Sequence, residues 1–244
     1  MKLKTFLLVG CLGGLFTLSS CTAPTNVKDY SAYVNPFIGT GGHGHTFPGA
    51  VVPHGMIQPS PDTRIDGWDA CSGYYYADST INGFSHTHVS GTGCCDYGDV
   101  LLMPTVGKQQ YRTTDPQSQR LAYASSFSHK NEIAEPGYYS VFLDTYQVKA
   151  EISSTKRGAI HRYTFPENTE SGFIIDLDYS LQRQTNSEME IEVISDTEIC
   201  GHKKTTYWAV DQYINFYAKF SKPFSYTLVT DSITMDNGKR LPVC

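Results

Sequence analysis

The sequence predicts an all-β fold, an antiparallel β-sandwich that carries long glycine-rich loops. Beyond Lys108, short alternating or apolar runs rich in β-branched and aromatic residues follow one another, and this period-2 alternation is the pattern of half-buried strands. Turn signals separate the runs at intervals of about 10 to 20 residues, a spacing typical of sandwiches. No run of ten or more residues carries a helical stripe of apolar positions, so helices are not expected to build the core.

The first twenty residues have the composition of an export signal. Two lysines precede an apolar run that ends near Leu18, and this run is shorter than the roughly 20 residues that cross a bilayer. The tetrapeptide LSSC, which ends at Cys21, resembles the bacterial lipobox, in which the cysteine is lipidated. We therefore expect residues 1–20 to be a lipoprotein signal peptide. The exported protein would be held to the membrane, at its periplasmic face or the cell surface, only by the lipid on Cys21. An ordinary secretory signal followed by an incidental cysteine is the alternative.

Charge and cysteine count argue against two classes of protein, those that bind nucleic acid and those held together by disulfides. Removal of residues 1–20 takes away two lysines and no acid, so the formal charge changes from -5 to -7. Nucleic acid is therefore not an expected partner, because phosphate binding needs a basic face. Of the seven cysteines, Cys11 is removed and Cys21 lipidated, which leaves 7 − 2 = 5. This odd number includes the adjacent Cys94 and Cys95, which rarely bridge each other, so a disulfide framework is not expected.

Residues 21–32 read as a short polar linker, and a single domain is expected over 33–244. Thirteen of the 21 glycines lie between Gly39 and Gly107, a density typical of loops rather than of helices. Loops of this length are usually functional or disordered, and the many histidines and tyrosines argue against disorder. Short strands are predicted within the region, in AVVP, GMIQPSP and GDVLLMPTVG.

The region beyond Lys108 supplies the remaining strands. Each predicted strand lies in a run of alternating or apolar residues: YYSVFLDTYQVKAEISST, RGAIHRYTF, SGFIIDLDYS, MEIEVISDTEICG, TTYWAVDQYINFYAKF and FSYTLVTDSITMD. Neither an internal repeat nor a low-complexity segment interrupts them.

Residues 86–99, HTHVSGTGCCDYGD, invite a metal-site interpretation. The candidate ligands are His86, His88, Cys94, Cys95, Asp96 and Asp99. A His-x-His pair on a strand places both side chains on one face, as in some zinc sites, but zinc sites with cysteine normally use well-spaced pairs. The acids do not follow the Asp-x-Asp-x-Asp-Gly spacing of an EF-hand calcium loop. Structural histidines that bind backbone carbonyls are the commoner outcome.

A carbohydrate site is the other candidate. Trp68 lies in DTRIDGWDACSGYYY, with Arg64, Asp66 and Asp69 close in sequence, and sugar sites join an aromatic platform to acids and arginines. A core position for Trp68 is the alternative. The chain has no Gly-x-Ser-x-Gly elbow, and GTGGHGH lacks the strand-turn-helix setting of a phosphate loop.

Two long motifs resemble a known family. YVNPFIGTGGHGHTFPGAVVPHGMIQPSPDTR, followed by GWDACSGYYYADSTINGFSHTHVSGTGCCDYGDVLLMP, is similar to the N-terminal domain of glycoside hydrolase family 92. The stretches EPGYYSVFL, TKRGAIHRYTFP and IIDLDYS fit as well, so the resemblance covers most of the chain that follows the linker. Members of this family are exo-acting α-mannosidases, often exported as lipoproteins.

The resemblance implies a β-sandwich of the galactose-mutarotase-like supersandwich type, followed by a C-terminal (α/α)6 barrel. It also implies a calcium-dependent, inverting mechanism on mannose-containing glycans, in which a carboxylic acid protonates the leaving oxygen and a carboxylate activates water. The acid, the base and most calcium ligands of the family belong to the barrel. We therefore expect no catalytic residue and no metal ligand in this chain, which would be a fragment that is inactive alone.

The resemblance also assigns roles within the chain. Trp68 matches a tryptophan that lines the subsite for the leaving sugar, and Asp66 and Arg64 are expected to bind substrate with it. His86, His88 and Asp96 are expected to hold the loop and the domain junction. The leading prediction is the N-terminal domain of an exo-α-mannosidase; a stand-alone carbohydrate-binding surface lipoprotein is the alternative, and a metal hydrolase built on His86 and His88 is the third.

Overall fold

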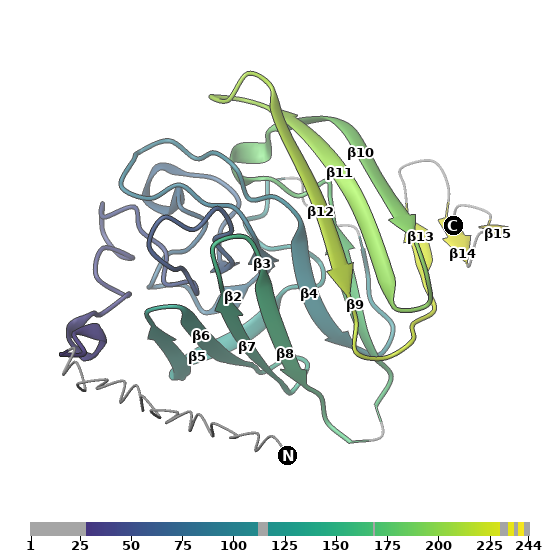
Figure 1. Ribbon diagram of the computed structural model, residues 1–244, viewed down its shortest axis with the longest axis horizontal. Helices are drawn as coiled ribbons and strands as arrows, with labels where there is room; N and C mark the ends of the chain where they lie inside the picture. Colours follow the sequence, from purple (N-terminus) through teal and green to yellow (C-terminus); the bar gives the residue numbers. More distant parts are fainter. Residues whose placement is uncertain (1–27, 112–116, 168, 230–233, 237–238, 242–244) are drawn as a thin grey trace, which may run out of the picture. The chain divides into compact units, whose positions relative to one another are not determined.

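The computed structural model describes residues 28–111, 117–167, 169–229, 234–236 and 239–241 (Figure 1). The expected signal peptide, the lipidation site Cys21 and most of the linker lie outside these residues. The contacts divide the chain into two compact units, Met1–Tyr30 and Ser31–Cys244, and the second contains every strand described below. Within the described ranges, no helix has the length and apolar character needed to cross a membrane.

The fold is all-β, as predicted. Apart from three short 3-10 helices, η1 (Ser31–Tyr33), η2 (Trp68–Ala70) and η3 (Leu181–Arg183), the regular elements of the described chain are strands. Those of the first half are β1 (Ser60–Asp62), β2 (Thr80–Ile81), β3 (Gly83–Ser85), β4 (Leu101–Val106), β5 (Ser125–Glu135), β6 (Tyr138–Leu143) and β7 (Val148–Ser154). Those of the second half are β8 (Ala159–Thr164), β9 (Ser171–Asp176), β10 (Thr185–Val193), β11 (Glu198–Thr206), β12 (Gln212–Lys219), β13 (Thr227–Val229), β14 (Thr234–Asp236) and β15 (Lys239–Leu241).

These strands form antiparallel sheets. A four-stranded sheet has the order β1-β3-β4-β9, and a five-stranded sheet has the order β2-β5-β6-β7-β8. Two three-stranded sheets follow along the chain, β10-β11-β12 and β13-β14-β15. Figure 1 draws the glycine-rich residues before β4 mostly as loops, in agreement with the sequence.

The hydrophobic core lies between the first two sheets. Phe84 of β3 meets Tyr139 of β6 and Tyr163 of β8, each with ring centroids 6.3 Å apart. Such aromatic pairs between sheets are typical of a sandwich core. The core includes buried residues from both sheets: Ile81, Phe84, Leu101, Met103, Phe127, Tyr139, Val141, Leu143, Val148, Ala150 and Ile152. Together they fix the scaffold on which the loops rest.

The hairpin of β6 and β7 shows how the alternating pattern produces this core. Val141 pairs with Ala150 across the hairpin, and both side chains are fully buried. Gln147 in the turn has a φ of 54°, a left-handed conformation that few residues adopt. Its side-chain amide donates to the carbonyl oxygen of Asp144 over 2.8 Å, which stabilises the reversal of the chain.

Two expectations for the glycine-rich region are wrong. AVVP, residues 50–53, forms no strand, and GMIQPSP contributes only the first residues of β1. The backbone at Ala50 is satisfied differently, because its carbonyl oxygen accepts a hydrogen bond of 2.6 Å from the Ser154 hydroxyl. Burial of Ala50 in the core therefore explains its apolar character without a strand.

The long strand β5 was not anticipated, because its sequence is polar. Its Glu132 is buried, where a carboxylate requires partners. The hydroxyl of Tyr74 donates to it over 3.0 Å and that of Tyr139 over 2.6 Å. The pairing with β6 is irregular between Phe127 and Glu132, so this strand does not present the regular alternation that sequence patterns detect.

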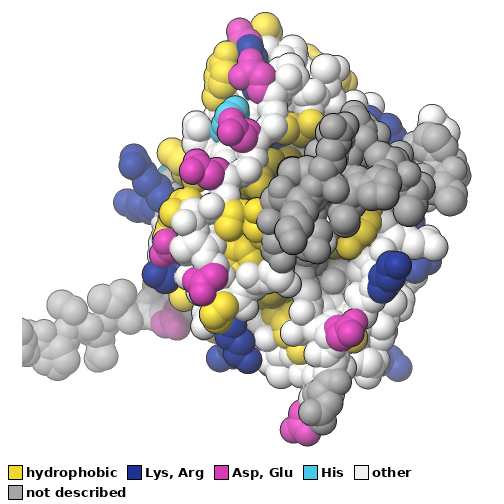
Figure 2. All heavy atoms as spheres, turned by 90° about the vertical axis from the view of Figure 1, so that its right-hand side faces the viewer, with side chains coloured by type: hydrophobic (Ala, Val, Ile, Leu, Met, Phe, Trp, Pro, Cys, Tyr) yellow, Lys and Arg dark blue, Asp and Glu magenta, His cyan; other side chains and the backbone are white. Residues whose placement is uncertain are grey.

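The β10-β11-β12 sheet is more exposed than the sandwich. Its strand β12 alternates along its length, and the outward-facing Tyr213 and Tyr217 are each 59% exposed. Met189 of β10 is exposed as well. Figure 2, which shows the right-hand side of Figure 1, displays hydrophobic side chains gathered in the middle of that face.

Candidate functional site

The segment 86–99 runs from the end of β3 to the start of β4, and its polar side chains point into the protein. Of its histidines and acids, His88, Asp96 and Asp99 are buried. Buried polar groups require hydrogen-bond partners, and each of these finds one outside the segment.

His86 forms a pair with His161 of β8. Its Nδ1 lies 2.7 Å from the carbonyl oxygen of Val100 and therefore donates, which leaves Nε2 to accept. The Nε2 of His161 lies 3.1 Å from this acceptor, and its Nδ1 accepts from the hydroxyl of Tyr163 over 2.8 Å. Desolvation lowers the pKa of both histidines, and a neighbouring imidazole lowers it further, that of His88 for His86 and that of His86 for His161. The pair is therefore neutral and links the segment to the five-stranded sheet.

His88 joins the segment to β1. Its Nδ1 lies 2.7 Å from the carbonyl oxygen of Gln58, and its Nε2 lies 2.8 Å from a carboxylate oxygen of Asp62. Both side chains of the His88 and Asp62 pair are fully buried. Because both ring nitrogens have protein partners, His88 is held in one orientation.

Asp96 and Asp99 join the segment to the β10-β11-β12 sheet. Asp96 accepts from the side chain of Gln184 over 2.9 Å and from the backbone of Ala209 over 3.3 Å. Asp99 accepts from Gln212 of β12 over 2.6 Å and lies 3.3 Å from the ammonium of Lys203 in β11, with both side chains of that pair fully buried. Segment 86–99 thus contacts three sheets through buried polar groups.

This arrangement leaves no room for the zinc site considered from the sequence. The ring nitrogens of His86 and His88 are all within hydrogen-bond distance of protein atoms. Cys95 is buried, and desolvation raises the pKa of its thiol to about 12, so it is not poised as a thiolate ligand. Cys71, Cys94, Cys95 and Cys200 are free thiols in the structure.

Trp68 is a large aromatic side chain on the surface of these loops. It begins the short helix η2 and is 61% exposed, which excludes the core position weighed from the sequence. The ring of His45 meets it edge to face, with centroids 4.9 Å apart. A Cβ at Gly93 would collide with the six-membered ring of Trp68, so the absence of a side chain at Gly93 allows the indole to pack on segment 86–99. An exposed and firmly seated indole is a surface on which an apolar ring face can stack.

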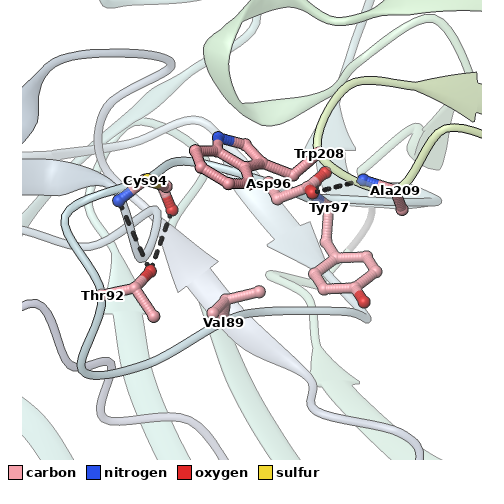
Figure 3. A pocket seen from close by; sticks show the side chains of 7 residues that line it. All are labelled: Val89, Thr92, Cys94, Asp96, Tyr97, Trp208 and Ala209. Atoms are coloured by element: carbon pink, nitrogen blue, oxygen red, sulfur yellow. Dashed lines mark hydrogen bonds between the residues drawn. The ribbon is translucent and has the colours of Figure 1, made fainter.

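A pocket of about 330 Å³ adjoins the same loop (Figure 3). Its lining residues are Val89, Thr92, Cys94, Asp96, Tyr97, Trp208 and Ala209. Figure 3 shows Thr92 and Cys94 on one side, Tyr97 and Ala209 on the other, and the indole of Trp208 above. Since Gly93 packs against Trp68 while its neighbours Thr92 and Cys94 line this pocket, one loop carries both features.

Arg64 and Asp66, predicted to bind substrate beside Trp68, are engaged with other residues. Arg64 forms a bidentate pair with Asp78, at 2.9 Å and 2.8 Å, and its guanidinium lies 4.2 Å from the ring centroid of Tyr75. The carboxylate of Asp66 accepts from Arg183 over 2.9 Å. Their role in sugar binding remains a prediction, since their charged groups already have protein partners.

The structure adds two residues that the analysis of the sequence missed as neighbours of Trp68. His43 and His45 come from the GTGGHGH stretch, and the Nδ1 of His43 lies 2.5 Å from a carboxylate oxygen of Asp69. The His-x-His spacing was a signal that could have drawn attention to them. Only the fold brings this stretch to η2, because 23 residues separate His45 from Trp68 (68 − 45 = 23).

A sandwich with these loops and an exposed tryptophan belongs to a known class. Residues 33–241 match the model of the glycosyl hydrolase family 92 N-terminal domain, and the chain therefore belongs to this family. Among solved structures, a family GH92 α-mannosidase from Bacteroides thetaiotaomicron, determined in complex with mannoimidazole, is 41% identical with a TM-score of 0.75. The match covers 79% of this chain and 25% of that enzyme.

Two further relatives are more distant. A family GH92 inverting mannosidase of the same bacterium is 26% identical with a TM-score of 0.66, over 86% of this chain and 27% of that enzyme. A protein of Arthroderma benhamiae described as an uncharacterized secreted glycosidase is 32% identical over 143 residues, which are 57% of this chain and 18% of the relative. The chain thus spans about a quarter of the solved enzymes and less than a fifth of the fungal protein.

Proposed function

We propose that this chain serves as the N-terminal domain of an exo-α-mannosidase that acts on mannose-containing glycans. Its loops supply one wall of the active site, and a C-terminal (α/α)6 barrel supplies the catalytic acid and base. The membership in glycoside hydrolase family 92 and the similarity to two Bacteroides mannosidases support this function. Export is supported by the relative described as secreted, and we propose that lipid on Cys21 holds the protein at the membrane.

The exposed indole of Trp68 is the observation that carries the proposal. The ring of His45 packs edge to face against the indole. Because Gly93 has no side chain, the indole can also pack closely on segment 86–99. A seated aromatic ring stacks on a sugar with little loss of conformational entropy, because it has few rotatable bonds. Trp68 then contacts the sugar next to the cleaved bond, while the catalytic groups act from the barrel.

Inverting hydrolysis requires two carboxyl groups about 6.5–9.5 Å apart with space for a water molecule between them. The acids near Trp68 are already engaged with neighbouring side chains. Asp66 is paired with Arg183, and Asp69 with His43. We therefore propose that this chain does not cleave mannosides by itself.

Calcium is the cofactor that the family resemblance implies for the whole enzyme. Calcium takes six to eight oxygen ligands, whereas the three clustered side chains near Trp68 offer two imidazoles and one carboxylate. This cluster does not fit calcium. We propose that the calcium of the complete enzyme is bound mainly by residues outside this chain.

Activity and binding assays test the proposal together. The purified chain is assayed on an aryl α-mannoside with and without calcium, and no turnover above background is expected. Turnover by this chain would contradict its catalytic dependence on the barrel. When the chain is joined to a family 92 barrel, we expect hydrolysis, and Trp68→Ala should reduce it, with the loss concentrated on substrates that carry a sugar at the leaving position.

The stand-alone carbohydrate-binding lipoprotein remains a second candidate, because the same exposed indole suits it. The two functions differ in what the isolated chain does. Binding of mannose-rich glycans by the isolated chain, abolished by Trp68→Ala, would favour the binding protein. Binding that appears only when the barrel is present would favour the mannosidase domain.

A further inference from the structure

A cluster of three potential metal ligands lies beside Trp68. His43, His45 and Asp69 each offer one ligand atom, and these atoms all lie within 4.8 Å of one another. We propose that these residues bind a divalent transition metal ion. Zinc is the ion used to test the proposal. This site is independent of the proposed mannosidase function, because its ligands and its test need neither sugar nor barrel.

The donor set determines the class of metal. Two imidazole nitrogens and one carboxylate oxygen match the three protein ligands of many zinc and iron(II) sites, which leave the remaining coordination positions to water or a substrate. Calcium and magnesium prefer oxygen ligands. His43 is 77% exposed at its side chain, so the open positions of the metal ion would face solvent.

The buried nitrogen of His45 is the second observation. His45 is only 8% exposed, and its Nε2 has no hydrogen-bond partner although the atom is buried. A buried polar atom without a partner is energetically unfavourable. Coordination by a metal ion would supply the missing partner. Every other described histidine of the glycine-rich region with a buried ring, such as His88, has its nitrogens satisfied.

The ligand distances require only a small adjustment. Bonds of about 2.0–2.2 Å in a tetrahedral site place ligand atoms about 3.3–3.6 Å apart. The Nδ1 of His43 and the Oδ1 of Asp69 are 2.5 Å apart, and the ligand atoms of all three residues lie within 4.8 Å of one another. The exposed side chain of His43 can move by the required distance without disturbing the core.

The loop that carries the two histidines is well fixed. The hydroxyl of Thr46 donates to the carbonyl oxygen of Ile38 over 2.9 Å, and the amide of Gly91 donates to the carbonyl oxygen of His45 over 2.6 Å. A Cβ at Gly44, between the histidines, would collide with the backbone of Gly39. Ligands on a rigid loop bind a metal ion with little ordering cost.

Equilibrium dialysis against zinc, followed by metal analysis of the full purified chain, tests the site. We expect one zinc ion per chain after removal of adventitious metal with a chelator, and no stoichiometric calcium under the same conditions. Loss of a partner that merely orients a ligand costs about 10–100-fold in affinity, so His43→Ala and Asp69→Asn, which remove ligands, should each weaken zinc binding at least that much. Both positions are accessible to solvent, and these variants should fold.

A matched control removes a different exposed imidazole. His54 has a φ of 59°, and asparagine tolerates this conformation, so His54→Asn should bind zinc as the parent does. Cys94→Ser, which removes a partly exposed thiol, should also retain the site. Trp208→Phe leaves Trp68 as the single tryptophan of the chain, and zinc should change its fluorescence because His45 touches its ring. The absence of stoichiometric zinc, preference for calcium, or equal weakening by His43→Ala and His54→Asn would each overturn the proposal.

Discussion

The neutral pair of His86 and His161 shows how one carbonyl oxygen can determine the protonation of a buried cluster. The carbonyl oxygen of Val100 can only accept, so it fixes the tautomer of His86 and, through it, that of His161. A proton added to Nε2 of His86 would break the Nε2 to Nε2 hydrogen bond, and a proton added to Nδ1 of His161 would remove the acceptor of the Tyr163 hydroxyl. Such a pair stabilises the fold only while both rings stay uncharged.

This pair predicts a loss of stability in mild acid. The pKa of both histidines is lowered from the ordinary value of 6.5, so between the folded and unfolded pKa values the unfolded chain binds more protons. The stabilising contribution is present in full above about pH 6.5 and is lost as the pH falls through the folded-state pKa. We expect urea unfolding midpoints to decrease from about pH 7 to pH 5.5, a range above the titration of most carboxylates.

The variant His161→Gln supplies the comparison. A glutamine amide can donate to His86 but does not titrate, so the decrease between these pH values should become shallower. An unchanged slope would show that other groups produce the pH dependence.

The ion pair of Asp99 and Lys203 is a second contact between single residues that determines the stability of the fold. Both side chains are fully buried, and burial lowers the pKa of Lys203 while Asp99 opposes this effect. Asp99→Ala leaves an ammonium group buried without its charged partner, which typically costs about 3–5 kcal/mol. We expect a corresponding fall in the free energy of unfolding by urea denaturation. The double variant Asp99→Leu with Lys203→Met should recover part of it, and no recovery would mean that the hydrogen bonds of Asp99 matter more than its charge.

At the scale of elements, segment 86–99 behaves as a connector between sheets as well as a support for Trp68. A Cβ at Gly93 would collide with the indole of Trp68, so Gly93→Ala should displace the ring while leaving the buried contacts of His88 and Asp99 in place. We expect an altered tryptophan fluorescence spectrum with a change in stability of less than about 1.5 kcal/mol. Gly41→Ala, where the nearest atom to a new Cβ is 3.7 Å away, should leave the spectrum unchanged.

Sequence patterns predicted some elements better than others, for physical reasons. β4, β6, β7, β8 and β9 were all predicted, because they lie in alternating or apolar runs; β8 alternates along its length, whereas β4, β6 and β7 contain runs of buried residues. β5 was missed because its sequence is polar, and Glu132 occupies a buried position where one of its partners, Tyr74, is 58 residues away. The strand expected at 50–53 was wrong, because apolar character reports burial and does not distinguish a buried loop from a buried strand.

At the scale of the whole molecule, the β10-β11-β12 sheet predicts association in solution. Tyr213 and Tyr217 are exposed on one strand, and large exposed apolar patches favour contact with other surfaces. Sedimentation velocity of the purified chain should show reversible oligomers at raised concentration, and Tyr213→Lys with Tyr217→Glu should reduce them. A monomer at all concentrations would show that this face does not drive association.

The candidate site could be predicted from the sequence only in part. Trp68 was identified through its motif, and the structure places it on the surface as a binding role requires. Its neighbours His43, His45 and Asp69 were not grouped with one another, and Arg64 and Asp66 were grouped with Trp68 although their charges face Asp78 and Arg183. Proximity in sequence does not reveal which charges a fold has already neutralised.

The ion pair of Asp99 and Lys203 has a consequence for the order in which the protein folds. The two residues are 104 positions apart (203 − 99 = 104), and contacts between such distant parts of a chain form late and slowly. Segment 86–99, on which the indole of Trp68 packs, would therefore reach its final arrangement late in folding. The surface around Trp68 would be complete only after the β10-β11-β12 sheet, which carries Lys203, had docked on this segment.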